Sequence, residues 1–446
     1  MQQVNNLTIP HGRVDAPEPY GEISSALHRF YKGKMAVTLK VPITSAEDFA
    51  IFYTPGVAGP CREIFKDPEK IYEYTNLGNQ VAIITDGSRI LGLGNIGRAG
   101  LPVMEGKALI YKYFGDVDAF PICLSTQDPD EIVQATKWIA SSFGGINLED
   151  ISSPKCFQIF KRLTEELEIP VFYDDYQGTA IVVLAGLLNA LKLVGKQMES
   201  LHVAFVGAGT ASIGCMRLMT AAGVKPGNMV IADSRGIIYE GRENMEAYKT
   251  EIAKMTNDSK TKGGIKEALK GADIAVCLSR PGPGILTKEM ILTMADRPIV
   301  FALANPVPEI LPDDAKKAGA RVVATGRSDL PNQVNNSLGF PGIFRGVLDV
   351  RATGINTEMM LSAAHEIARF AEEKGLREDY IVPDMMDLPL YPRVAAAVGE
   401  SAVSTGMARI KLSRQALREN AESRIDKYQR SLHSLVKNGF IANNTS

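Results

Sequence analysis

The stretch from Leu201 to Asp233 restricts the possible fold of this chain more than any other. It reads LHVAFVGAGTASIGCMRLMTAAGVKPGNMVIAD. A short apolar strand runs into a glycine-rich turn, a helix follows at once, and a second apolar strand ends in Asp233. This order of elements is the βαβ unit of a doubly wound parallel sheet.

The glycine turn in this unit is typical of a dinucleotide site. Its free backbone N–H groups lie at the start of a helix, where they can bind a pyrophosphate. Ser212 takes the third position of G-x-G-x-x-G, which only requires a side chain small enough for close packing. Asp233 stands where a carboxylate binds the ribose hydroxyls. We predict NAD or NADP binding, with contacts from Gly207, Gly209, Thr210, Ala211, Asp233 and Arg235.

Arg235 leaves the cofactor preference open. An aspartate alone favours NAD, whereas a nearby arginine can pair with the 2′-phosphate of NADP. A solvated turn residue is an equally good interpretation of Arg235.

A perfect G-x-G-x-x-G also occurs upstream, at Gly92, Gly94 and Gly97, but in the wrong context. The preceding Asp-Gly pair, 86–87, predicts a hairpin turn. Pro102 predicts that the next helix begins only five residues after the third glycine. Because a dinucleotide turn must join the end of a strand to the start of a helix, we do not expect this loop to bind the cofactor.

The pattern changes near residues 175 and 350, which predicts three regions in the 446 residues. Residues 1–175 indicate a mixed α/β catalytic domain, which begins with an irregular arm and a first helix. Residues 176–350 indicate a Rossmann-type, doubly wound parallel-sheet domain, and residues 351–446 a helical segment. The predicted strands lie at 81–85, 117–124, 272–279, 298–305 and 320–326, and a predicted helix lies at 130–143.

Charge and composition narrow the possible partners. The net charge is −2 and no basic block occurs, so neither nucleic acid nor an anionic membrane is an expected partner. The first residues lack the apolar core of a secretory signal. The longest apolar run, 179–195, is interrupted by Asn189 and Lys192 and predicts a buried helix. Five scattered cysteines indicate reduced thiols and a cytoplasmic protein.

Two pairs of adjacent acidic residues indicate either a metal site or helix capping. Glu149-Asp150 and Asp174-Asp175 each follow an apolar segment. Adjacent carboxylates repel each other, so a cation often compensates them. Oxygen ligands of this kind suit Mg²⁺ or Mn²⁺. Capping of the following helix is the alternative, above all for Asp175.

A tyrosine and a lysine are conspicuous in otherwise apolar surroundings. Tyr53 precedes the rigid Pro-Gly turn of FYTPGVAGP, and Lys107 interrupts the apolar helix PVMEGKALIY. A lysine on a buried face has a lowered pKa and becomes a possible base. Packing of Tyr53 and extension of Lys107 to solvent are the commoner alternatives.

Together these motifs resemble the short form of the malic enzymes. The resemblance extends from about residue 20 to about residue 410. It depends on the ordered motifs FYTPGVA, TDGSRILGLGNIG, LPVMEGKALIY, INLED, FYDDYQGTA, FVGAGTA, LANPVPE and GRSDLPNQVNNSLGFPGIFRG. It implies oxidation and decarboxylation of L-malate to pyruvate and CO₂, with NAD or NADP and with Mg²⁺ or Mn²⁺, by a homodimer.

The resemblance also implies a role for each motif residue. Tyr53 would be the general acid, Lys107 the general base, and Asp174 the residue that orients Lys107. The implied metal ligands are Glu149, Asp150 and Asp175. Arg89, Asn305 and Asn336 would contact malate, and Asn305 would also lie at the cofactor. The loop with Gly94 would then line the malate pocket.

Two other functions stay open at this point. A 2-hydroxy-acid dehydrogenase on the same scaffold could stop before decarboxylation. A catalytically silent nucleotide-binding regulator would keep the fold, but such proteins usually lose an acid, a base or a metal ligand. Here Tyr53, Lys107 and the acidic pairs are all present.

Overall fold

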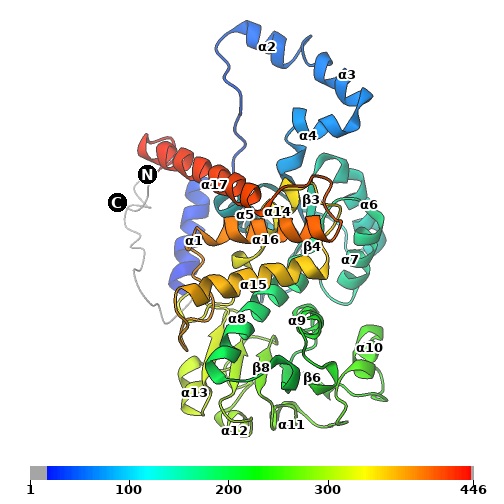
Figure 1. The fold of residues 1–446 in the computed structure, drawn as a ribbon, viewed down its shortest axis with the longest axis vertical. Coiled ribbons are helices and arrows are strands. Elements are labelled where there is room, and N and C mark those ends of the chain that lie inside the picture. Colours follow the sequence, from blue (N-terminus) through cyan, green and yellow to red (C-terminus); the bar gives the residue numbers. More distant parts are fainter. Residues whose placement is uncertain (1–17, 443–446) are drawn as a thin grey trace.

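The computed structural model describes residues 18–442. Two parallel sheets, each flanked by helices, lie beside a layer of long helices, and a helical arm stands at one end (Figure 1). The predicted fold class is confirmed: a mixed α/β domain, a doubly wound domain and C-terminal helices. The prediction that a secretory signal is absent concerns residues 1–17, which lie outside the described range.

The first sheet is entirely parallel. Its strands lie in the order β2 (Asp118–Cys123), β1 (Gln80–Thr85), β3 (Gly145–Leu148) and β4 (Val171–Tyr173). Side chains of β1 alternate between two apolar cores, one shared with α5 (Leu101–Gly115) and the other with α6 (Pro129–Ile139) and α7 (Lys155–Glu166). The carboxyl ends of parallel strands meet at one edge, where functional loops gather.

The predicted hairpin after β1 is wrong. Strand β1 pairs only in parallel, with β2 and β3, and the Asp-Gly pair begins a long crossover loop to α5. The positive φ of Gly87 (+67°) serves the turn of this loop and not a hairpin. The DG signal therefore marked a turn correctly, but short-range sequence does not say which strand the chain joins next.

The second sheet has the order expected of a dinucleotide-binding domain. It runs β10 (Val322–Thr325), β9 (Ile299–Ala302), β8 (Ile274–Cys277), β5 (Val203–Val206), β6 (Met229–Asp233) and β7 (Gly236–Ile237), with only β7 antiparallel. Helix α9 (Thr210–Ala221) connects β5 to β6. The strand order reverses between β5 and β8, and ligands bind at such a switch point. The remaining helices are α10 (Ala247–Met255), α11 (Ile265–Leu269), α12 (Lys288–Ile291) and α13 (Pro312–Lys317).

Long helices join the two domains. Helix α8 (Thr179–Val194) follows β4 through a short π-helical turn, η5 (Asp174–Gly178). By length and composition the segment Asp174–Val194 could cross a membrane, but 78% of its most apolar 18-residue window is buried inside the fold, so it is a core helix. Helices α14 (Phe340–Asp349) and α17 (Arg414–Lys437) pack against α5, so the C-terminal part covers the first domain.

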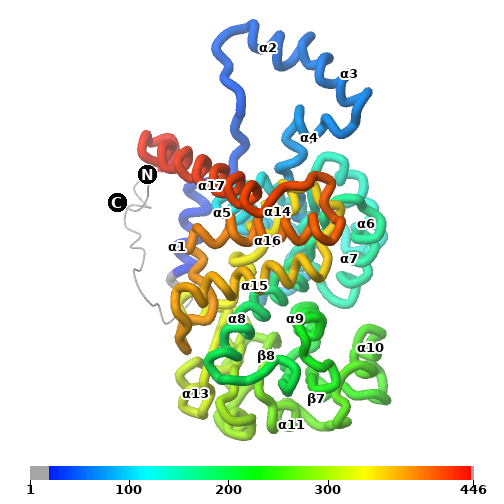
Figure 2. Tube along the Cα trace, in the orientation of Figure 1, coloured from blue at the N-terminus to red at the C-terminus, as the bar shows by residue number. Residues whose placement is uncertain are grey.

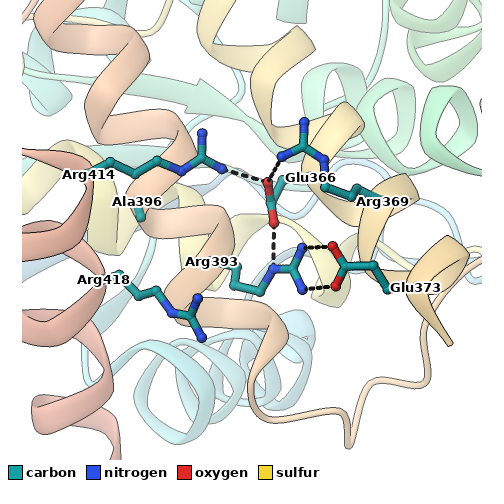
Figure 3. Close-up of a pocket in the computed structure, with 7 residues that line it drawn as sticks. All are labelled: Glu366, Arg369, Glu373, Arg393, Ala396, Arg414 and Arg418. Carbon is teal, nitrogen blue, oxygen red and sulfur yellow. Dashed lines mark hydrogen bonds and ion pairs between the residues drawn. The ribbon is translucent and has the colours of Figure 1, made fainter.

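A cavity of about 330 Å³ lies among the C-terminal helices (Figure 3). Its walls come from α15 (Thr357–Glu373), α16 (Leu390–Ser404) and α17, and Glu366 accepts hydrogen bonds from Arg393 and Arg414 inside it. Arg393 also forms two hydrogen bonds to Glu373. These ion pairs link the three helices across the cavity. The cavity is separate from the acidic residues that follow the strands of the first sheet.

Residues 35–76 form the arm, which includes α2 (Ala46–Phe52), α3 (Ala58–Lys66) and α4 (Ile71–Tyr74). It follows α1 (Glu18–Tyr31). In Figures 1 and 2, α2 and α3 stand clear of both domains. No residue from 35 to 76 is buried. The arm therefore has no hydrophobic core of its own.

Candidate active site

The acidic residues lie at the carboxyl ends of neighbouring strands. Glu149 and Asp150 follow β3, and Asp174 and Asp175 begin the π-helical turn after β4. A single wide turn of this type is often found at a functional site. The parallel topology therefore brings two pairs that are distant in sequence to one edge of the first sheet, where the backbone N–H of Asp150 donates to Asp175 (2.9 Å).

Lys107 lies at the centre of this cluster. Its Nζ forms ion pairs with Asp174 and, at 3.0 Å, with Glu149, and it lies 4.2 Å from the centre of the Phe340 ring. Its side chain is only 11% exposed, so the alternative that it extends to solvent is wrong. Asn336 donates from Nδ2 to Asp174 Oδ2 (2.8 Å), which orients the same carboxylate.

The expected depression of the Lys107 pKa is not found. Burial alone would lower that pKa, but the carboxylates of Asp174 and Glu149 outweigh burial and raise it above its ordinary value. The sequence indicated a buried face but did not show that two carboxylates lie at the same point. In the ligand-free chain Lys107 is therefore a cation.

Three carboxyl groups of this cluster, those of Glu149, Asp150 and Asp175, have raised pKa values and are weaker acids than usual. Burial raises the pKa of Asp150 to about 7, and the nearby charge of Asp175 adds to the effect. Burial also raises the pKa of Glu149 and of Asp175. Four carboxylates here lie near two cations, Lys107 and Arg89, and the raised pKa values show that the cluster would favour an additional positive charge.

The predicted metal ligands are close together but are not arranged as a finished metal site. Among residues 18–442, no three histidine, cysteine, aspartate or glutamate side chains form a group that could hold a metal ion. The reason lies in their present partners, because Glu149 binds Lys107 and Asn147, and Asp175 accepts the Asp150 N–H. Buried Asp150 Oδ2 and Asp174 Oδ1 nevertheless have no hydrogen-bond partner in the described structure, and an oxygen-rich donor set suits a hard divalent cation.

Of the predicted substrate residues, Asn336 contacts the cluster directly. Arg89 is exposed, and its charge opposes the rise in the pKa of Asp150 and Asp175. A Cβ added to Gly209 would lie 4.0 Å from Arg89 Nη1, which places the same arginine at the dinucleotide turn. Asn305 is exposed, and its backbone carbonyl oxygen lies 3.6 Å from a Cβ built on Gly92. The upstream glycine loop therefore faces Asn305.

The dinucleotide turn has the close approaches that its glycines imply. Gly207 has φ +111°, and a Cβ there would lie 2.4 Å from the Leu278 carbonyl oxygen. Gly214, which the sequence analysis did not single out, is equally constrained, since its Cβ would lie 2.0 Å from the Tyr176 carbonyl oxygen. This packing holds α9 against the turn that carries Asp174 and Asp175.

Asp233 ends β6 as expected but is already engaged. Arg242 and Lys249 pair with its carboxylate, and its side chain is only 7% exposed. Burial would raise the pKa of Asp233, but hydrogen bonds from Arg242, the Arg235 N–H and Lys249 lower it to about 2. Arg235 itself is exposed and donates to the carbonyl oxygens of Glu243 and Asn244.

Tyr53 is the one predicted catalytic residue that the structure does not bring to this cluster within a single chain. It ends α2 on the arm, and 70% of it is exposed. The alternative that Tyr53 is buried by packing is wrong for the same reason.

Three supporting residues escaped the sequence analysis. Phe340 lies against Lys107, and Tyr111 donates to Asn147 Oδ1 (2.8 Å), while Asn147 in turn donates to Glu149 Oε2 (2.9 Å). Tyr111 lies one helical turn after Lys107, a spacing that could have indicated a shared face. Nothing in the local sequence links Phe340 to that face.

Two side-chain contacts join the first domain to the dinucleotide domain near these groups. Phe157 and Tyr248 have ring centroids 5.1 Å apart, and the Cys156 thiol lies 3.5 Å from the Thr210 hydroxyl. The helix that follows the dinucleotide turn thus packs against the turn that carries Asp174 and Asp175. The fold and site define a nucleotide-dependent oxidoreductase built from two α/β domains.

Comparison with known proteins gives the family. The model described as malic enzyme, N-terminal domain, matches residues 32–164, and the model described as malic enzyme, NAD binding domain, matches residues 176–403. The chain belongs to the malic enzyme family and is an NAD- or NADP-dependent oxidoreductase of malate. The resemblance drawn from the motifs is thereby confirmed.

Individual relatives agree with this assignment. The chain is 52% identical over 395 residues to the bifunctional malic/malolactic enzyme of Bacillus subtilis, covering 88% of this chain and 95% of the relative. It is 47% identical to the NADP-dependent malic enzyme of Halomonas elongata, covering 84% and 92%. The crystal structure of Entamoeba histolytica malic enzyme matches with a TM-score of 0.92 and 43% identity, covering 95% of this chain and 90% of that one.

Proposed function

We propose that this chain converts L-malate into pyruvate and CO₂, with transfer of a hydride from C2 to NAD⁺ or NADP⁺. The observation that carries the proposal is the buried Lys107, paired with Asp174 and Glu149. In this scheme Lys107 would first give up its own proton when Glu149 turns from it to a bound divalent cation, and the neutral amine would then accept the proton of the C2 hydroxyl. The nicotinamide, when bound, supplies the hydride acceptor.

The other predicted residues bind and orient the substrate. Arg89 pairs with a malate carboxylate, and Asn305 and Asn336 donate amide N–H groups to substrate oxygens. Asp174 positions Lys107 and does not itself react. Glu149, Asp150 and Asp175 would hold Mg²⁺ or Mn²⁺ once Glu149 is released from Lys107. That cation would supply Lewis-acid chemistry and would favour the ionised form of the carboxylates that hold it.

The proton for C3 is proposed to come from Tyr53 of a second copy of this chain. Within the described structure, the tyrosines near Lys107 are already used, because Tyr111 donates to Asn147 and Tyr173 to the Ile151 carbonyl oxygen. Tyr53 is free and exposed, at the end of an arm helix. A homodimer that exchanges arms would complete two sites.

The surface of the arm supports docking onto another copy. Large apolar side chains with no buried neighbours are exposed along it, namely Val37, Leu39, Phe49, Ile51, Phe52, Val57 and Phe65. Apolar surface of this kind marks an interaction site. The Entamoeba match leaves fewer residues unmatched than the arm contains, so arm residues belong to the shared fold.

The reaction is tested by its products. Malate, Mn²⁺ and either cofactor should yield pyruvate, CO₂ and reduced cofactor in equal amounts. Lactate is measured as well, because the Bacillus relative is a malic/malolactic enzyme. Reduced cofactor without pyruvate would instead favour the non-decarboxylating dehydrogenase. Lys107→Ala should abolish turnover, whereas Lys112→Ala, one turn further along α5 and paired with Asp116, should not.

The exchange of arms has its own test. Tyr53→Phe and Lys107→Ala are each purified, found nearly inactive, and then mixed under conditions that let subunits exchange. Half of the dimers should then hold one intact site, which restores about a quarter of the wild-type activity. If the mixture stays as inactive as its components, Tyr53 does not act on the partner subunit.

The cellular location is proposed to be the cytoplasm. All five cysteines are free thiols in the structure. Unpaired, partly buried thiols persist in a reducing compartment. Fractionation of cells that express a tagged chain would test this location.

A further inference from the structure

Asp233 cannot accept hydrogen bonds from a ribose in its present surroundings. Its Oδ1 accepts from the Arg235 backbone N–H (2.9 Å) and from Arg242 Nη1 (2.9 Å). Its Oδ2 accepts from Arg242 Nη2 (2.5 Å) and lies 3.1 Å from Lys249 Nζ. An ionised carboxylate offers about four lone-pair sites, and all of them are occupied.

The same cluster contains several cations. Arg242 and Lys249 pair with Asp233, Lys249 also pairs with Glu246, and Arg235 lies in the same loop. Several donors remain unused. The buried Arg242 Nε has no hydrogen-bond partner in the described structure, and exposed Arg235 uses its side chain only on two carbonyl oxygens.

The cluster lies beside the dinucleotide turn. Tyr248, the neighbour of Lys249 on α10, donates to the Ala208 carbonyl oxygen between the two glycines (3.2 Å). The Gly207 N–H donates to the Ala232 carbonyl oxygen next to Asp233 (2.8 Å). In this fold the end of β6 is where the adenosine ribose binds. These cations therefore lie at the strand end where the 2′ position of that ribose is expected.

We propose that Arg235 and Lys249 bind the 2′-phosphate of NADP and that the chain prefers NADP⁺ over NAD⁺. Asp233 acts as the anchor of these cations and does not bind the ribose. Arg242 is a positioning residue, because it saturates Asp233 and holds its charge beside the phosphate. The inference deepens the proposed function by selecting its cofactor.

Equilibrium binding without malate or metal tests the preference independently of turnover. Fluorescence titration with NADPH and NADH, and calorimetry with adenosine 2′,5′-bisphosphate and AMP, give the selectivity directly. We expect the ligands with a 2′-phosphate to bind at least about tenfold more tightly. Equal or weaker binding of NADPH would overturn the proposal, even if the chain made pyruvate. Failure to make pyruvate would leave this binding test unaffected.

Variants separate the roles. Arg235→Ala and Lys249→Ala should each weaken NADPH binding by about tenfold while NADH binding changes by less than about threefold. Arg242→Ala should free Asp233, so NADH should bind more tightly and NADPH more weakly. Lys288→Ala on α12, paired only with Asp314, is the matched control and should change neither. Equal losses for both nucleotides in the Arg235 and Lys249 variants would contradict the assignment.

Discussion

Single residues of this protein owe their chemistry to neighbours that are remote in sequence. Lys107 is buried, which favours a neutral amine, yet two strand-end carboxylates keep it charged. Asp233 ends a strand in the ribose-binding position, yet four donor groups of three residues already contact its carboxylate. In both cases the residue type was foreseeable from the sequence, but its protonation or its partners depended on the folded chain.

Gly207→Ala should prevent cofactor binding, because the one atom that it adds clashes with the backbone. The new Cβ would lie 2.4 Å from a carbonyl oxygen, at φ +111°. Gly223→Ala is the matched control, since Gly223 has φ +112° but its nearest atom is 3.8 Å away. We expect both variants to lose some stability and only Gly207→Ala to lose NADPH binding by titration. Equal binding losses would show that backbone strain, and not the close approach, matters.

Asp233 predicts a loss of stability in acid. Its pKa is about 2 in the folded chain, below the ordinary value of 3.8. A lowered pKa means that the ionised form stabilises the fold above pH 4, and that this contribution is lost as the pH falls toward 2. Asp233→Asn should therefore lose less stability than the wild type over this interval in urea titrations. Parallel curves would mean that the Arg242 and Lys249 pairs do not stabilise the fold.

At the scale of elements, ion pairs tie the C-terminal helices together. Glu366 on α15 is 4% exposed and accepts hydrogen bonds from Arg393 of α16 and Arg414 of α17 (Figure 3). Breaking a buried ion pair leaves an uncompensated charge, which costs about 3 kcal/mol. Breaking an exposed pair costs less than about 1 kcal/mol.

Glu366→Ala should therefore lower the free energy of unfolding by about 3 kcal/mol. Glu400→Ala, which removes a 50% exposed partner of Arg414, should change it by less than about 1 kcal/mol. Denaturant unfolding monitored by circular dichroism measures both. Similar small effects would show that water already reaches the cavity around Glu366.

The same scale separates what sequence predicts from what it does not. The predicted strand at 81–85 and the long helix after residue 179 match β1 and α8, because apolar runs are sufficient to fix buried elements. The prediction of a hairpin after β1 was wrong, because a turn signal does not determine the partner strand. The carboxylates beside Lys107 could be expected at one place, because parallel strands bring their carboxyl ends to the same edge of a sheet. Phe340 could not be predicted, since it arrives from another domain.

At the scale of the whole molecule, the arm is proposed to dock onto a second copy of this chain. Phe65 is 90% exposed on α3, and nothing in the arm is buried. Phe65→Glu should therefore weaken dimers and lower specific activity at low protein concentration, with recovery on concentration. Trp138→Glu, at a 73% exposed aromatic of α6 outside the arm, is the control. Light scattering reports the oligomer, and unchanged dimerisation of Phe65→Glu would contradict docking through α3.

An arm that docks onto the other subunit also has a genetic consequence. If the arm of each subunit serves its neighbour, a harmful change at Tyr53 would injure the product of the other allele in a mixed dimer and spare the site in its own chain. Two different defective alleles, one in the arm and one at the lysine, would then rescue each other in the same cell. Rescue between two such alleles would therefore reveal the exchange of arms, which an assay of a single purified variant does not reveal.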